Sequence, residues 1–138
     1  MKNIFIHKRG MILINALVFA VVAVTVTTSL VNWGATTLKN SKQLSSREQA
    51  FQIAEAGIDY YRWHLAHNQT DYTDGNATTT TGPFVHDFKD KDGNIIGNFA
   101  LTITPPSVGS TVVMIKSKGS INDGSGVVRS IEANLAIP

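Results

Sequence analysis

The chain contains no cysteine, only four prolines, and no acidic residue before Glu48. Without cysteine no disulfide can close a loop, and the sequence gives no indication of a redox compartment. All the prolines lie from Pro83 onward, so the first 82 residues contain no proline that would break a long helix. These absences exclude a disulfide scaffold, and they allow a long N-terminal helix.

The charge balance gives little support to a nucleic-acid partner. The isoelectric point is 9.0, with 12 basic and 10 acidic residues, but Lys2, Lys8 and Arg9 all precede Gly10. Without the first ten residues the side chains carry a net charge of −1. No basic stripe with interleaved aromatic residues remains, so DNA or RNA is not an expected partner.

An apolar run of 21 residues without any charge, Met11–Val31, is the strongest single signal. At about 1.5 Å per residue, a helix of this length matches a bilayer core of roughly 30 Å. Lys8 and Arg9 should hold its N-terminus in the cytoplasm, and Trp33 suits the interface at the other end. A secretory signal peptide is the alternative, but its apolar segment is usually about 7–15 residues long. We therefore expect a membrane-spanning helix over 11–33.

The helical pattern continues after the apolar run, over 34–67. Apolar side chains recur there mostly at spacings of three, four or seven: Leu38, Leu44, Phe51, Ala54, Ile58, Tyr61 and Leu65. Gly34 is a candidate bend, and Gly57 costs about 1 kcal/mol relative to Ala inside a helix. The pattern predicts one long helix with an amphipathic second half.

After His67 the composition becomes polar and the period shifts to two. Residues 68–82 form a polar loop, and four antiparallel strands are predicted beyond it, over 84–88, 95–103, 111–118 and 127–137. The fold class is therefore α+β, a long N-terminal helix packed on a small sheet. Four segments are predicted: 1–10 (leader), 11–33 (apolar helix), 34–67 (amphipathic helix) and 68–138 (head).

The last predicted strand alternates between a polar and a largely apolar face. The second face contains Val127, Arg129, Ile131, Ala133 and Leu135. A head of about 70 residues is marginal as a separate core, so Phe51, Ile58 and Leu65 of the helix are expected to cover this sheet. Tyr61, Tyr60 and Trp63 are predicted to form the seam between helix and sheet.

Several short motifs together resemble one protein superfamily. Lys8-Arg9-Gly10 followed by Met11-Ile12-Leu13-Ile14-Asn15 and an apolar helix resembles the class III leader of type IV prepilins and pseudopilins. The run Ala50–Ile58 is similar to the helix of PilX-type minor pilins. A closing strand, Val127–Ala133, after a Lys118-Gly119-Ser120 turn resembles the end of such heads.

The resemblance implies a defined sequence of events. A membrane prepilin peptidase would cut between Gly10 and Met11, favouring Gly for its lack of a side chain, and would methylate the new amine on Met11. Lys8 and Arg9 would hold the site at the anionic membrane surface. The expected partners are lipid before assembly, other pilin subunits through the helix, and an inner-membrane assembly platform. The expected location is the cytoplasmic membrane, with the head outside, and then a cell-surface filament.

Asn15 departs from the pattern of the major pilins. They have Glu at this fifth mature position, where it is thought to neutralise the terminal amine of a neighbouring subunit. An amide accepts a hydrogen bond from an ammonium but cannot cancel its charge. Asn15 therefore favours a minor, tip or priming subunit, although an Asn near a membrane helix end can also be merely tolerated.

Metal and glycan sites have weak support in the sequence. Asp87, Asp90, Asp92 and Asn94 offer oxygen ligands for Ca²⁺, but no bidentate Glu follows, and a hairpin turn at Asp92-Gly93 explains the cluster without an ion. Asn68 and Asn76 begin N-glycosylation sequons, for which a soluble loop is the simpler interpretation.

His64 and His67 lie three residues apart without an evident partner, which a helix C-terminus explains as well as a metal. No nucleophile elbow or phosphate loop is present, so neither catalysis nor a cofactor is predicted. Two functions stay open: a pilin-like structural subunit of a type IV pilus or related secretion or competence filament, and an uncleaved single-span membrane protein with an extracytoplasmic binding or sensor domain.

Overall fold

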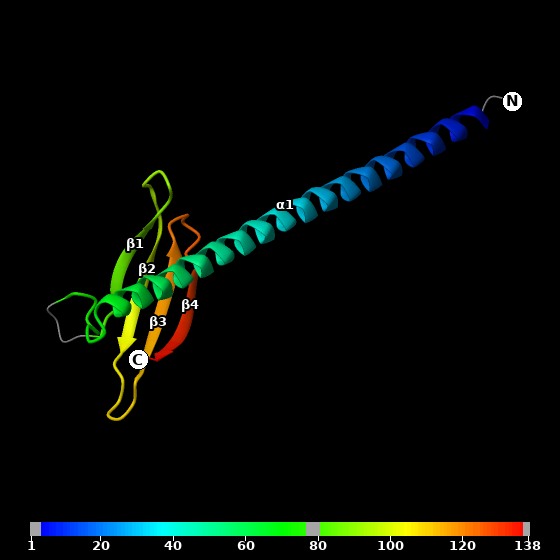
Figure 1. Ribbon diagram of the computed structural model, residues 1–138. Coiled ribbons are helices and arrows are strands. Elements are labelled where there is room, and N and C mark those ends of the chain that lie inside the picture. The colour runs from blue at the N-terminus through cyan, green and yellow to red at the C-terminus, as the bar shows by residue number, and fades with distance from the viewer. Residues whose placement is uncertain (1–3, 77–80, 137–138) are drawn as a thin grey trace. The chain divides into compact units, whose positions relative to one another are not determined.

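A computed structural model describes residues 4–76 and 81–136, with side chains from Gly10 onward. It contains one helix, α1 (Ile4–His67), and four strands, β1 (Phe84–Lys89), β2 (Ile95–Thr104), β3 (Val112–Ile121) and β4 (Val128–Ala136) (Figure 1). The α+β class with a long N-terminal helix and an antiparallel four-stranded sheet is therefore confirmed. The chain divides into two compact units, Met1–Lys42 and Gln43–Pro138.

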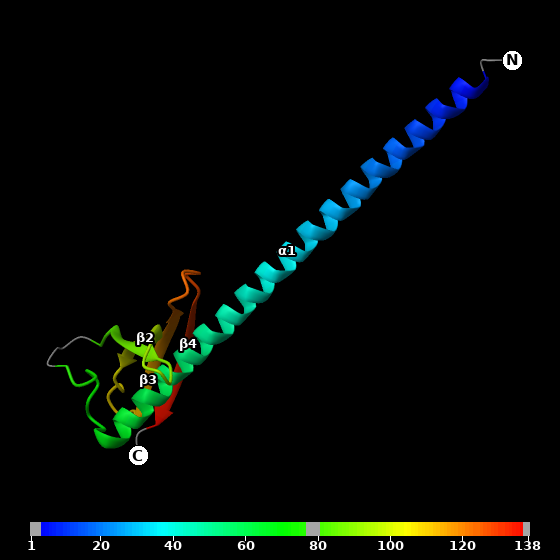
Figure 2. The ribbon, with the colours of Figure 1, turned by 90° about the horizontal axis from the view of Figure 1, so that it is seen from above.

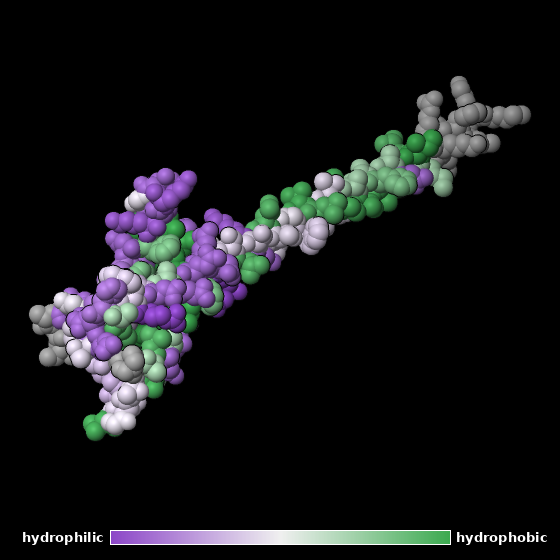
Figure 3. All heavy atoms as spheres, viewed as in Figure 1, coloured by the Kyte–Doolittle hydropathy of each residue, from purple (hydrophilic) through white to green (hydrophobic). Residues whose placement is uncertain are grey.

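The first unit is helical throughout its described part. α1 continues through Gly34, the candidate bend, without a break. Exposed large apolar side chains between Met11 and Val31 occupy successive positions all round the helix, and Figure 3 shows much of this stretch as apolar on the face in view. A helix that is apolar all round is typical of an apolar environment rather than of a water-exposed surface.

The strands follow one another in the order β1-β2-β3-β4, and each neighbouring pair is antiparallel. This is the simplest arrangement for strands joined by short connections. A shift of register between Phe88 and Lys89 bends the end of β1, which is an edge strand. The polar connection at Asp92-Gly93 joins β1 to β2 as a hairpin, in agreement with the prediction from its sequence.

One predicted boundary is wrong. Lys118-Gly119-Ser120 is not a turn but lies inside β3, which continues to Ile121 and pairs Gly119 with Phe99 of β2. The reason is close packing against the helix. A side-chain carbon at Gly119 would clash with the backbone of Ala50 and Ala54, so glycine is needed here to let the strand approach α1.

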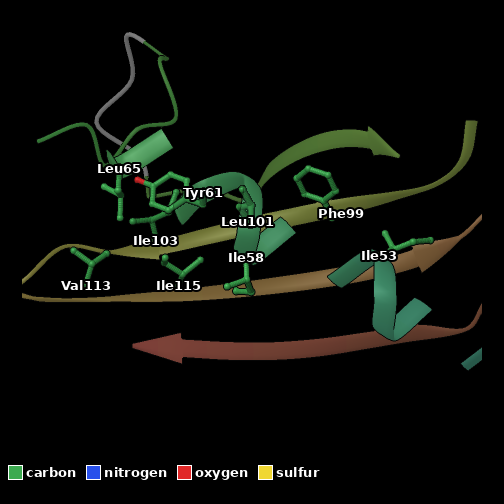
Figure 4. Close-up of a cluster of buried hydrophobic side chains, with 9 residues drawn as sticks. All are labelled: Ile53, Ile58, Tyr61, Leu65, Phe99, Leu101, Ile103, Val113 and Ile115. Carbon is green, nitrogen blue, oxygen red and sulfur yellow. The ribbon is translucent and has the colours of Figure 1, made fainter. Parts of the chain in front are cut away.

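The core of the second unit forms between one stripe of α1 and one face of the sheet (Figures 2 and 4). The buried residues of α1 are Ser46, Ala50, Ile53, Ala54, Gly57, Ile58, Tyr61 and Leu65. They face Phe99, Leu101, Ile103, Val113 and Ile115 of β2 and β3. The spacing of three and four residues places this whole stripe on one side of the helix.

The predicted apolar face of β4 also packs on this core. Ile131, Ala133 and Leu135 are partly buried against it, whereas the intervening residues are exposed. Arg129, which the alternation placed on the same face, is exposed. β4 is the second edge of the sheet, so its side chains are only half covered.

Four helix residues that belonged to the predicted apolar repeat or to the predicted seam are exposed. Phe51 is 40% exposed because the buried stripe is centred on Ala50 and Ala54, about 100° away around the helix. Trp63 was expected at the seam but is 61% exposed, since it lies two residues beyond the buried Tyr61. Leu38 and Leu44, the first two members of the repeat, are also exposed. Tyr60 and Tyr61 do contact the core, as predicted.

Gly57 has a packing role rather than only a cost in helix propensity. A side-chain carbon at this position would clash with the hydroxyl of Ser117 and lie 2.9 Å from the ring of Phe99. Small residues on both sides therefore bring α1 unusually close to β3. At the N-terminal end of the buried stripe of α1, Ser46 donates a 2.8 Å hydrogen bond to Asp123 in the β3–β4 loop.

Candidate functional site

The apolar part of α1 is the most exceptional surface of the chain. Thirteen large apolar side chains between Met11 and Val31 are each 52–76% exposed, and none of the most apolar 18-residue window is buried by other described residues. By length and composition this segment is able to cross a membrane. Trp33, which follows it, is 72% exposed.

Hydroxyl groups within this segment are satisfied by the helix itself. Thr25, Thr27, Thr28 and Ser29 each donate to a backbone carbonyl three or four residues earlier, at 2.8 Å in each case. Bonds of this kind allow Ser and Thr to enter an apolar medium. Asn15 differs, because its exposed side-chain amide has no hydrogen-bond partner among the described residues.

Gly10, the first residue of the predicted cleavage junction, lies within α1 and is exposed. A side-chain carbon at this position would meet no atom within 4 Å, and its φ is not positive. The fold therefore does not require a glycine here. The side chains of Lys8 and Arg9 lie outside the described residues.

The weak Ca²⁺ candidate is divided by the hairpin. Asp87 lies in β1 opposite Asn98, while Asp90, Asp92 and Asn94 belong to the connection. The Asp90 carboxylate accepts hydrogen bonds from the backbone amides of Asp92 and Asn94, both at 2.9 Å, and from the Asn94 side chain at 3.1 Å. Those bonds, the Asn94 side chain first, lower the pKa of Asp90. The carboxylate thus stabilises the turn.

A cluster that the sequence did not reveal lies where α1 ends. His64 Nε2 is 2.8 Å from Asp71 Oδ2, and the Tyr61 hydroxyl donates to the backbone carbonyl of Asp71 at 2.7 Å. Asp71 also accepts from the amide and hydroxyl of Thr73 and from the amide of Gly75. The Asp-x-Thr spacing is the signal of such an Asx turn, but nothing in it indicates a histidine partner.

A second histidine contacts the same loop from the sheet. His86 of β1 contacts Asp74, whose side chain is only 1% exposed and whose φ of 53° is in the left-handed region. The ring of Tyr60 lies 4.7 Å from that of His86 and 5.7 Å from that of Phe99. One oxygen of Asp74, Oδ1, has no hydrogen-bond partner among the described residues.

The titration behaviour of this cluster follows from burial and hydrogen bonding. Burial raises the pKa of the Asp71 carboxyl, but the bonds from Thr73, His64 and Gly75 outweigh that effect and lower the pKa to about 2. Burial, followed by the nearby carboxylates, raises the pKa of both Tyr60 and Tyr61. Asp71 therefore stays ionised, and both tyrosines stay neutral, over the physiological range.

The two C-terminal helix histidines do not form a pair. His67 lies 2.8 Å from the carbonyl of Trp63, whereas His64 contacts Asp71, the acidic partner that the sequence analysis did not identify. Over residues 10–76 and 81–136 no three His, Cys, Asp or Glu side chains are arranged to hold a metal ion.

The glycosylation candidates lie in the same loop. Asn68 is exposed and accepts a 3.5 Å bond from Thr70. Asn76 donates to the carbonyls of Thr73 and Asp74. The rest of its sequon, Ala77 and Thr78, lies outside the described residues.

Comparison of the chain with protein-family models, with curated proteins and with solved structures finds no match.

Proposed function

We propose that the protein is a pilin-like structural subunit, of minor, tip or priming type, in a type IV pilus or a related secretion or competence filament. The observation that carries the proposal is the continuous helix α1. Its N-terminal part exposes apolar side chains all round, and its C-terminal part packs on a sheet. The sequence junction at Gly10 adds the expected processing step.

The energetic argument concerns the exposed apolar side chains. At roughly 1.5–3 kcal/mol for each one, full burial of thirteen large apolar residues would gain about 20–40 kcal/mol. A typical domain is stable by only about 5–15 kcal/mol, so this segment needs another apolar medium. Lipid supplies it before assembly, and the helices of other subunits supply it in a filament.

The glycine at the junction supports recognition by an outside partner. No steric or conformational need of the fold accounts for Gly10. A peptidase that reads the backbone at this position does account for it, because a side chain would obstruct the cleft. In the proposed cycle the peptidase removes residues 1–10 and methylates Met11, and the assembly platform then transfers the helix from lipid to the filament.

Mass spectrometry of the mature chain tests the proposal. In cells with an active prepilin peptidase, we expect loss of residues 1–10 and a methyl group on Met11. The Gly10→Leu variant should stay full-length and in the membrane. Gly34→Leu is the matched control, since its site also has nothing within 4 Å, and it should be cut normally.

An intact Met1 on the mature wild-type chain in such cells would exclude the filament proposal. It would favour the other candidate, an uncleaved single-span protein whose extracytoplasmic head binds or senses a ligand. Wild-type amounts of Gly10→Leu in sheared filaments would contradict the cleavage step alone.

A further inference from the structure

Two histidines from two different elements contact carboxylates of the loop formed by residues 68–76. His64 on α1 contacts Asp71, and His86 on β1 contacts Asp74. Asp71 and Asp74 are only three residues apart, so the two contacts together hold the centre of the loop between the helix end and the edge of the sheet.

Both contacts are largely shielded from water. The side chains of His64 and Asp71 are 18% and 12% exposed, and those of His86 and Asp74 are 33% and 1% exposed. By contrast, the side chains of the ion pair between Arg62 and Asp59 are 62% and 74% exposed. Charge matters more at the shielded sites, because water screens exposed pairs.

The groups around the two imidazoles limit what can change charge near neutral pH. His64 faces Asp71 and the rings of Tyr60 and Tyr61, and His86 faces Asp74, Tyr60 and the ring of Phe99. Neither carboxylate forms an ion pair with a Lys or Arg of the described residues. Asp71 stays ionised, both tyrosines stay neutral, and imidazole is the side chain that titrates between about pH 5 and 8.

We propose that the contacts His64–Asp71 and His86–Asp74 form a pH-dependent clasp that holds the 68–76 loop in mildly acidic surroundings and loosens it above neutral pH. With both imidazoles protonated, each contact is an ion pair reinforced by a hydrogen bond. With both neutral, each carboxylate still accepts a hydrogen bond from an imidazole N–H, but the attraction between two opposite charges is lost, so each contact is weaker. The position of the loop on the head surface thus depends on acidity, whatever the head binds.

Hydrogen exchange of the full-length protein in detergent micelles tests the clasp. The amides of Thr73 and Gly75 report on it directly, because they donate to the Asp71 carboxylate at 2.9 and 2.8 Å. After correction for intrinsic exchange rates, we expect their protection to fall at least about fivefold from pH 5.5 to pH 8.5. Amides of β2 and β3 should keep their protection, which would show that the opening is local.

The double variant His64→Gln/His86→Gln should lose this pH dependence, since an amide carries no charge at either pH. Each single variant should keep part of it, and protected β2 and β3 amides will show that the head is folded. His67→Gln is the matched control, as His67 contacts a carbonyl and no carboxylate. Loop protection that is equal at both pH values in the wild type, or a full pH effect in the folded double variant, would overturn the clasp.

Discussion

The Asp71 carboxylate accepts four hydrogen bonds. Thr73 donates to it twice, and Gly75 and His64 once each. Together these bonds close the first turn after α1 and, with Tyr72 packed against the core, hold a mostly polar loop at the helix end. At the scale of single residues, the Asp71 side chain thus links the loop after α1 to His64 of the helix.

The Asp71→Asn variant should therefore destabilise the head in a pH-dependent way. Because the folded-state pKa of about 2 lies below the ordinary 3.8, the stabilisation is complete above about pH 4 and is lost as the pH falls towards 2. We expect a loss of about 2 kcal/mol at pH 7 and almost none at pH 2. Urea unfolding followed by circular dichroism measures this.

Asp59→Asn is the control for that experiment, since Asp59 is exposed and has only a long contact with Arg62. Its effect should be within about 0.5 kcal/mol at any pH. An equal loss for Asp71→Asn at pH 2 and pH 7 would show that the ionised carboxylate is not what stabilises the loop.

Ser117 is a second residue for which the structure predicts how a substitution changes stability. Its hydroxyl is fully buried beneath Gly57 and has no hydrogen-bond partner among the described residues. Replacing it by Ala removes an unsatisfied buried polar group, so Ser117→Ala should stabilise the head by about 1 kcal/mol.

Ser120 on the same strand provides the comparison, because its hydroxyl donates to Asn98 at 2.6 Å. Ser120→Ala should destabilise by about 0.5–1 kcal/mol. Thermal unfolding of both variants measures the difference, and a destabilised Ser117→Ala would mean that the hydroxyl has a partner.

At the scale of elements, the contact between α1 and β3 depends on the absence of side chains. Ala50 and Ala54 face Gly119, and Gly57 faces Ser117, so the backbones of helix and strand are closer than large residues would allow. This contact fixes the position of the helix on the sheet. It also explains why a glycine within a helix, which costs about 1 kcal/mol, is tolerated at 57.

Gly119→Ala should therefore be strongly destabilising, by about 3 kcal/mol, because the new methyl group meets backbone atoms that cannot move aside. The free energy of urea unfolding measures the loss. Lys118→Ala changes the neighbouring exposed residue and should alter stability by less than about 0.5 kcal/mol. A Gly119→Ala protein as stable as the wild type would contradict the close approach of β3 to α1.

The sequence alone was sufficient for the order and type of the elements. Apolar periodicity gave the long helix, and the shift to alternation with turn residues gave the four antiparallel strands. It found much of the buried helix face, since Ala54, Ile58, Tyr61 and Leu65 of the predicted repeat are buried. It did not find Ala50, and it wrongly included Phe51. Nor did it reveal that Gly119 lies in a strand, since a glycine required by close packing has the same sequence signal as one required by a turn.

The loop cluster was beyond the reach of sequence analysis for a different reason. His86 and Asp74 are joined by tertiary folding across 12 residues, and His64 meets Asp71 only because the chain turns back after α1. The turn itself had a sequence signal, whereas its two histidine partners had none. For Gly10 and Asn15 the situation is reversed. Their proposed roles come from the sequence, and the fold does not reveal them because they concern molecules outside this chain.

At the scale of the whole molecule, one helix contains both the exposed apolar run and the stripe that packs on the sheet. Within the apolar run the hydroxyl groups are bonded internally, so Asn15 is the polar side chain there that is left without a partner among the described residues. In an apolar medium such a group gains from a partner on another molecule. The amine of a neighbouring subunit's Met11 is the partner that the proposed function supplies.

The Asn15→Glu variant tests this role. A carboxylate both bonds and neutralises an ammonium, whereas the amide only bonds it, so we expect the variant to be cut normally between Gly10 and Met11 but to enter filaments about threefold more often. Quantitative mass spectrometry of sheared filaments gives the ratio of this chain to the other subunits. Asn15→Gln keeps the amide and should leave that ratio unchanged. Identical ratios for wild type and Asn15→Glu would remove the argument that Asn15 limits the subunit to a minor, tip or priming position.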